Sequence, residues 1–173
     1  MTRSKLYFAY GSNLNVQAMG HRCPRAKKIG KLILPKARLV FRGVADCIYD
    51  PRTRCPGGLW RITRQCEEEL DHYEGVAGGL YRKEYIKVQL RGQEPEDALV
   101  YVMNRGGVMP PWESYLDTIA QGYLDFGLDT HLWRLDEALV YSYDHKNKTP
   151  HLRKRWENKG KPKLARPGDV VCL

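Results

Sequence analysis

The 173-residue sequence lacks long hydrophobic runs and CxxC pairs, and its cysteines are odd in number. No stretch approaches the ~18 apolar residues of a membrane-spanning helix, so no membrane span is expected. Five scattered cysteines favour neither a disulfide framework nor a structural zinc site, and we expect reduced thiols. A chain of this length can bury a sizeable core as one domain without either kind of cross-link.

Motifs of several enzyme classes are also missing. Neither the GxxxxGK[ST] phosphate loop nor a dinucleotide fingerprint occurs, so no nucleotide cofactor is expected. Ser12 lacks the GxSxG context of a serine hydrolase. His21, His72 and His131 have no HxxE or HExxH spacing, so we expect no metal site either.

The charge and the two ends of the chain bear on its location and partners. Residues 1–5 lead directly into an aromatic run without a secretory signal, and we expect a soluble, cytoplasmic protein. The net charge is +9, and the segment His145–Arg166 holds nine Lys and Arg against one Glu. Such a run is most often solvated charge, so nucleic acid is not an expected partner. We divide the chain into a domain, residues 1–142, and a basic tail, residues 143–173, that can pack on it.

Hydrophobic alternation and turn residues predict both strands and helices. The expected strands are Leu6–Tyr10, Leu32–Phe41, Leu59–Ile62, Tyr81–Leu90 and Ala98–Met103, with Val170–Val171 as a candidate for a last one. Pro51, Pro56 and the pair Gly57–Gly58 are expected in loops. The expected helices are Asn15–His21, a helix capped by Thr63 that runs to Tyr73, Trp112–Phe126, and one capped by Asp129.

The turn Gly11–Asn13 follows the first predicted strand. Its residue types tolerate unusual backbone angles, and consecutive main-chain N–H groups in such a turn can hold a small anion or an oxyanion. An isolated Gly-Ser-Asn is more often a plain strand-to-helix turn with the Asn as a cap. The residues around the turn decide between these interpretations.

Two segments carry a resemblance to a known family. The run Tyr7–Leu14, with the sequence YFAYGSNL, resembles the YGSN(L) signature of the γ-glutamylcyclotransferase family, which includes AIG2-like proteins. The run Leu70–Val76, followed by Gly79 and Tyr81, is similar to the segment that carries the catalytic glutamate of that family. With shorter matches elsewhere, the resemblance covers residues 6–128.

The resemblance implies a fold, an activity and a set of site residues. The implied fold class is mixed α/β (α+β), with a small, mostly antiparallel, barrel-like sheet flanked by helices. Glu74 is implied as the catalytic acid and base, and a γ-glutamyl compound as the small-molecule substrate, with no metal or cofactor. The implied substrate-binding residues are Tyr7, Phe8, Ala9, Tyr10, Gly11, Ser12, Asn13, Tyr81, Tyr101 and Met103.

The chemistry explains why one carboxylate suffices. In a γ-glutamyl compound the α-amine can attack the δ-carbonyl of the same chain, which gives 5-oxoproline and a free amine. A single acid that removes a proton from the α-ammonium and returns it to the departing amine completes the reaction. Near neutral pH such an acid needs a pKa of ~6–7, which partial burial of Glu74 can give.

Several alternatives stay open at this stage. Glu84 and Glu113 are fallback acids, although charge pairing on exposed faces explains both. A non-catalytic binding protein on the same fold is the alternative function; it would use the pocket for a γ-glutamyl-like ligand or the basic tail for nucleic acid. The sequence chooses neither among γ-glutamyl substrates nor between a monomer and a homodimer.

Overall fold

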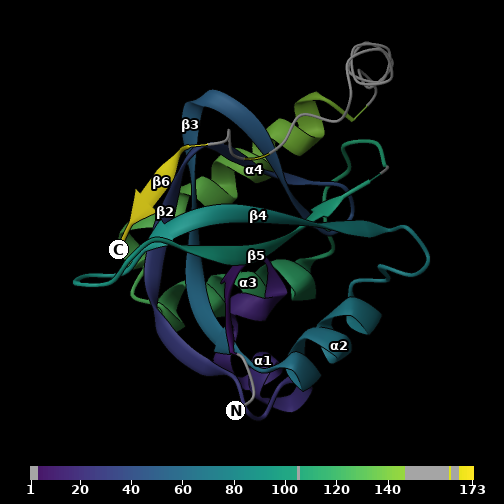
Figure 1. The fold of residues 1–173 in the computed structure, drawn as a ribbon. Coiled ribbons are helices and arrows are strands. Elements are labelled where there is room, and N and C mark those ends of the chain that lie inside the picture. Colours follow the sequence, from purple (N-terminus) through teal and green to yellow (C-terminus); the bar gives the residue numbers. More distant parts are fainter. Residues whose placement is uncertain (1–3, 105, 147–163, 165–167) are drawn as a thin grey trace.

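The computed structural model describes residues 4–104, 106–146, 164 and 168–173, and this part of the chain contains a six-stranded sheet with four α-helices around it (Figure 1). The strands are β1 (Lys5–Ala9), β2 (Lys27–Phe41), β3 (Ala45–Ile62), β4 (Tyr81–Gln89), β5 (Glu96–Met103) and β6 (Val170–Cys172). The helices are α1 (Val16–Arg22), α2 (Arg64–Tyr73), α3 (Glu113–Asp125) and α4 (Trp133–Asp144), with short 3-10 helices η1 (Ser12–Leu14) and η2 (Asp129–His131).

The strand order is β2-β3-β1-β5-β4-β6, and the sheet curls into a nearly closed barrel. Three of its neighbouring pairs are antiparallel, whereas β1 pairs with β5, and β4 with β6, in parallel. The two edges approach each other, since the Leu173 side chain lies 3.5 Å from where a Cβ at Gly30 of β2 would be. The expected fold class, a mixed and mostly antiparallel barrel-like sheet flanked by helices, is confirmed.

One prediction about this sheet was wrong. Pro51, Pro56 and Gly57–Gly58 do not lie in loops but within the continuous strand β3, where Gly57 pairs with Leu32 of β2. The two glycines meet a packing requirement instead. A Cβ at Gly57 would overlap the ring of Phe8, and a Cβ at Gly58 would overlap the ring of Phe126. Glycine inside a strand here marks the close approach of an aromatic ring rather than a turn.

The helix ends follow the capping residues in two cases and depart from them in one. Thr63 caps α2, as expected. Asn15, which was expected as the first residue of its helix, instead caps α1 by accepting a hydrogen bond from the Ala18 amide at 2.9 Å. Asp129 does not cap α4 but begins η2, and Leu132 precedes α4 without a capping hydrogen bond. None of the helices in the described ranges is long and apolar enough to cross a membrane.

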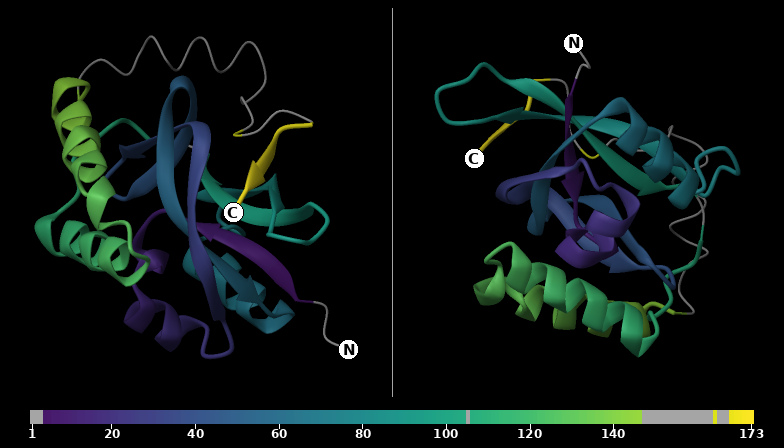
Figure 2. Two further views of the ribbon diagram at one scale, coloured as in Figure 1. Left: turned by 90° about the vertical axis from the view of Figure 1, so that its left-hand side faces the viewer. Right: turned by 90° about the horizontal axis from the view of Figure 1, so that it is seen from below.

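The helices form two groups around the sheet. Helices α3 and α4 lie together on one side, where α4 packs on β2 (Figure 2). Helices α1 and α2 contact each other near the end of the sheet that faces downward in Figure 1. Helix α3 also packs against η1. The turn that follows β1 is therefore enclosed from several sides, which is where the candidate site lies.

The end of the chain contributes to the sheet. The candidate strand at Val170–Val171 is confirmed as β6, which pairs with β4 through Val88 and Val171. Residues 147–163 and 165–167, which hold most of the predicted basic tail, lie outside the described residues, and the role of the tail stays a prediction.

Alanine substitutions at two helical glycines are expected to change the stability of the fold in opposite directions. A Cβ at Gly122 of α3 would overlap the Leu14 side chain and the Asn15 amide, whereas nothing lies within 4 Å of a Cβ at Gly20 of α1. We expect Gly122→Ala to lower the free energy of unfolding by about 1–3 kcal/mol through overpacking. Gly20→Ala is expected to raise it by about 0.8 kcal/mol through helix propensity.

Urea unfolding of both variants beside the wild type tests this expectation. Equal stabilities for the two alanine variants would show that α3 does not approach η1 as closely as described.

Candidate active site

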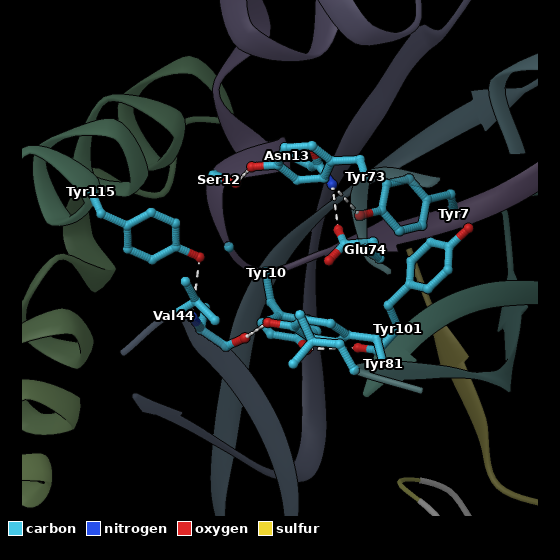
Figure 3. Close-up of a pocket in the computed structure, with 13 residues that line it drawn as sticks. Tyr7, Tyr10, Ser12, Asn13, Val44, Tyr73, Glu74, Tyr81, Tyr101 and Tyr115 are labelled. Atoms are coloured by element: carbon cyan, nitrogen blue, oxygen red, sulfur yellow. Dashed lines mark hydrogen bonds between the residues drawn. The ribbon is translucent and has the colours of Figure 1, made fainter. Parts of the chain in front are cut away.

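A cavity of about 230 Å³ opens beyond the carboxyl end of β1, where the chain turns through Gly11 into η1 (Figure 3). Because β1 and β5 run parallel, the carboxyl ends of both strands meet at this edge, and the start of β4 lies beside the end of β5. The residues that line the cavity are Tyr7, Tyr10, Gly11, Ser12, Asn13, Val44, Ala45, Tyr73, Glu74, Leu80, Tyr81, Tyr101 and Tyr115.

Asn13 is the hub of hydrogen bonds at this cavity. Its Nδ2 donates to Glu74 Oε1 and to Tyr7 Oη, both at 2.9 Å, as Figure 3 shows. Its Oδ1 accepts from Arg22 Nη1 at 2.8 Å, and its main-chain oxygen accepts from Trp60 Nε1 at 3.0 Å. The residue is 3% exposed, and these bonds hold its side chain in one orientation.

Glu74 reaches the cavity from the end of α2. Its main-chain N–H donates to Leu70 O at 2.8 Å, which places the residue directly after the last turn of the helix. Burial raises the pKa of its carboxyl group to about 7, against the opposing effects of the Arg22 charge and of the Asn13 hydrogen bond. Glu74 is thus the lining residue that can exchange a proton near neutral pH.

Tyrosines form most of the remaining wall, and several are tied to the main chain. Tyr10 Oη donates to Tyr101 O at 2.6 Å, and Tyr81 Oη donates to Ala45 O at 2.5 Å. Tyr115 Oη accepts from the Ala45 amide at 3.0 Å. Burial raises the pKa of Tyr115 to about 12 and that of Tyr81 further, so both hydroxyls are protonated at neutral pH.

The turn itself offers main-chain donors. Gly11 O and Ser12 O accept hydrogen bonds from the amides of Leu14 and Asn15, at 3.0 and 3.1 Å. Gly11, Ser12 and Asn13 are lining residues of the cavity, and among the described residues no acceptor bonds their main-chain amides. These three N–H groups are available to an anionic oxygen of a ligand.

The structure brings most, but not all, of the expected site residues together. Tyr7, Tyr10, Gly11, Ser12, Asn13, Glu74, Tyr81 and Tyr101 line the cavity. Phe8, Ala9 and Met103 do not. Side chains alternate along a strand, so the Phe8 ring points away from Tyr7 and lies against Gly57. The main-chain amide of Met103 donates to the buried Asp46 carboxyl group at 2.9 Å.

The cavity wall also contains residues that were not predicted from the sequence. These are Val44, Ala45, Tyr73, Leu80 and Tyr115. Tyr73 and Leu80 flank the Glu74 segment, so their position beside the motif was a usable signal. Tyr115 comes from α3, and no local pattern distinguishes its wall role from an ordinary core position.

The fallback acids lie elsewhere in the fold. Glu84 accepts hydrogen bonds from the Arg82 guanidinium and from the Leu164 amide, and Glu113 is exposed in the first turn of α3. Neither lines the cavity. No cluster of three or more His, Cys, Asp or Glu suited to a metal ion occurs within the described part of the chain.

The chain is similar to known proteins of one family. The family described as "Gamma-glutamyl cyclotransferase, AIG2-like" matches residues 7–126. Gamma-glutamylcyclotransferase of Mus musculus is 30% identical over 135 residues, which is 71% of this chain and 72% of that protein. The Homo sapiens protein of the same name is 28% identical over 137 residues, 72% of this chain and 73% of its own.

A solved structure described as a gamma-glutamyl cyclotransferase superposes with a TM-score of 0.68 at 25% identity, covering 84% of this chain and 88% of its own. The matched region contains the turn after β1, the end of α2 and the strands between which the cavity lies. The chain therefore belongs to the gamma-glutamyl cyclotransferase, AIG2-like family.

Proposed function

We propose that the protein is a γ-glutamylcyclotransferase, which converts a γ-glutamyl amine or γ-glutamyl amino acid to 5-oxoproline and releases the amine. The names of its relatives support the reaction. The observation that carries the proposal is the Glu74 carboxyl group, which faces the cavity with a pKa of about 7 and lies 2.9 Å from Asn13 Nδ2 of the glycine turn.

In the proposed mechanism Glu74 moves the proton. As a carboxylate it accepts a proton from the α-ammonium group of the substrate, and the freed amine attacks the δ-carbonyl carbon. When the tetrahedral intermediate collapses, the bond to the departing nitrogen breaks and the protonated Glu74 returns the proton to that nitrogen. The ring nitrogen loses its second proton to the released amine, which leaves as an ammonium ion. A pKa near the working pH lets one group do both, because neither protonation state is strongly disfavoured.

The developing oxyanion is assigned to the main-chain amides of Gly11, Ser12 and Asn13. These donors are fixed by η1 and need not reorganise during the reaction. Removal of one such donor in other enzymes costs about 3 kcal/mol of transition-state stabilisation. The turn therefore supplies the charge stabilisation, and no metal or cofactor enters the proposed steps.

The size of the cavity supports a bent γ-glutamyl group as its occupant. At about 230 Å³ it is smaller than the ~300–1,000 Å³ of typical ligand pockets, so it encloses the glutamyl arm alone. The departing amine then lies toward Tyr73 and Leu80, which are 45% and 47% exposed. Holding the arm bent turns the attack into a well-oriented intramolecular step.

The remaining site and location assignments belong to the same proposal. Tyr7, Tyr10, Tyr81 and Tyr101 are proposed to contact the substrate as walls of the cavity, a role for which their position is the support. Glutathione is one candidate substrate, and the cytoplasm is the proposed location. Residues 1–142 are proposed to form the catalytic domain.

The first test is product analysis against a panel of γ-glutamyl donors. The panel contains γ-glutamyl amino acids, a γ-glutamyl amine and glutathione, with α-glutamyl dipeptides as matched controls that cannot cyclise in the same way. We expect 5-oxoproline, detected by mass spectrometry, from at least one γ-glutamyl donor and from no α-glutamyl control. Saturable binding of a donor without any product would instead favour the binding-protein alternative.

A further inference from the structure

We propose that Arg22, which lies outside the cavity, is a positioning residue that holds Asn13 and Tyr73 in their working orientation around Glu74. The inference rests on the proposed function of that site. Arg22 is the last residue of α1, is half-buried and does not line the cavity. It contacts two residues that do.

The first contact fixes the amide of Asn13. Arg22 Nη1 donates to Asn13 Oδ1 at 2.8 Å, which leaves Asn13 Nδ2 pointing at Glu74 and Tyr7. A guanidinium has donors only, and a carboxylate has acceptors only. Turning the amide over would place its oxygen against the carboxylate and its NH₂ group against the guanidinium. Arg22 therefore keeps the donor of Asn13 directed toward the proposed acid and base.

The second contact fixes the ring of Tyr73 at the mouth of the cavity. Arg22 Nη2 donates to Tyr73 Oη at 2.8 Å, and the guanidinium carbon lies 3.7 Å from the centre of the tyrosine ring. Tyr73 Oη is also 3.2 Å from Ser12 Oγ. One guanidinium thus connects the end of α1, the glycine turn and the residue before Glu74, although 61 positions separate Ser12 from Tyr73.

Arg22 also supplies positive charge to the site. Its charge lowers the pKa of Glu74, against the larger effect of burial. The other titratable groups whose charge interacts with Glu74 are the hydroxyls of Tyr7 within β1, Tyr10 directly after β1, Tyr81 of β4, Tyr101 of β5 and Tyr115 of α3, and burial keeps all five protonated at neutral pH. Loss of the Arg22 charge should therefore raise the pKa of Glu74 further, because that charge opposes the effect of burial.

Lysine cannot reproduce both functions. An ammonium group keeps the charge but lacks the planar, forked donors that bond two acceptors while stacking on a ring. Comparing Arg22→Gln with Arg22→Lys therefore separates charge from geometry. Arg25→Gln is the matched control, because Arg25 is exposed, lies three positions away and loses the same charge.

The experiment measures the rate of 5-oxoproline formation from the best donor of the panel between pH 5 and 9. The acidic limb of the wild-type pH–rate profile is expected near pH 7, where Glu74 loses its proton. For Arg22→Gln we expect the limb to move up by about one pH unit, with kcat at pH 7 falling at least tenfold and KM changing less. Arg22→Lys should keep the limb and lose kcat, and Arg25→Gln should match the wild type.

A second readout needs no activity. Carbon-13 NMR of the Glu74 carboxyl, assigned by its loss in Glu74→Gln, reports the same titration in each variant. An unchanged Glu74 titration in folded Arg22→Gln overturns the inference, as does a loss of kcat shared equally by Arg25→Gln. A wild type that makes no 5-oxoproline defeats the proposed function, while the NMR shift still decides the role of Arg22.

Discussion

Glu74→Gln is expected to lower the rate of 5-oxoproline formation by about a thousandfold or more, since general acid–base catalysis typically contributes 10²–10⁴-fold. Glutamine has nearly the same shape and can still accept the hydrogen bond from Asn13 Nδ2. It cannot take a proton from the substrate or return one. The change therefore removes the proton transfer and leaves the cavity intact.

Steady-state kinetics with the best γ-glutamyl donor measures this effect, and Glu68→Gln is the matched control. Glu68 lies on α2, the helix that ends just before Glu74, and it is exposed. It forms an ion pair with Arg64 at 3.0 Å and does not line the cavity. We expect Glu68→Gln to keep full activity. If Glu74→Gln retained more than about a tenth of the wild-type rate, the proposed role of Glu74 would be wrong.

The same substitution is expected to stabilise the fold at alkaline pH. The carboxyl of Glu74 titrates near 4.5 in an unfolded chain and near 7 in the folded one, so the folded state binds the proton more tightly. The associated stability is fully present below pH 4.5 and is lost as the pH rises through 7. By linkage, the wild type should lose about 2–3 kcal/mol over this window through Glu74 alone.

Urea unfolding of the wild type and Glu74→Gln across pH 4–9 tests the sign as well as the size. The difference in unfolding free energy between the two proteins should change in favour of Glu74→Gln by about 2–3 kcal/mol between pH 4.5 and 8. A constant difference across that range would mean that Glu74 has an ordinary pKa in the folded protein. Stability given up at an ionised active-site residue is a common cost of function.

The parts of the site that are local in sequence could be predicted, because short motifs specify them. The turn Gly11–Asn13 follows a recognisable strand, and Glu74 lies at the end of a helix whose cap, Thr63, was identifiable. The approach of these two segments is not local. It follows from the pairing of β1 with β3 and from the contact between α1 and α2, for which the family resemblance, and not the residue pattern, was the guide.

What could not be predicted depends on packing between distant segments. Gly57–Gly58 has the composition of a turn, and only the rings of Phe8 and Phe126 against β3 show why the strand continues through it. Arg22 looked like any arginine at a helix end, since its partners Asn13 and Tyr73 are 9 and 51 positions away. Alternation along β1 likewise turns Phe8 out of the site that its motif suggested.

The tyrosine hydroxyls of the cavity wall have a thermodynamic consequence for ligand capture. Tyr10 and Tyr81 each bond a main-chain carbonyl, and Tyr115 accepts from a main-chain amide, so these rings have little rotational freedom left to lose. A ligand that enters such a container pays little entropy for ordering its walls. A larger share of the binding free energy is then available to bend the glutamyl chain toward ring closure.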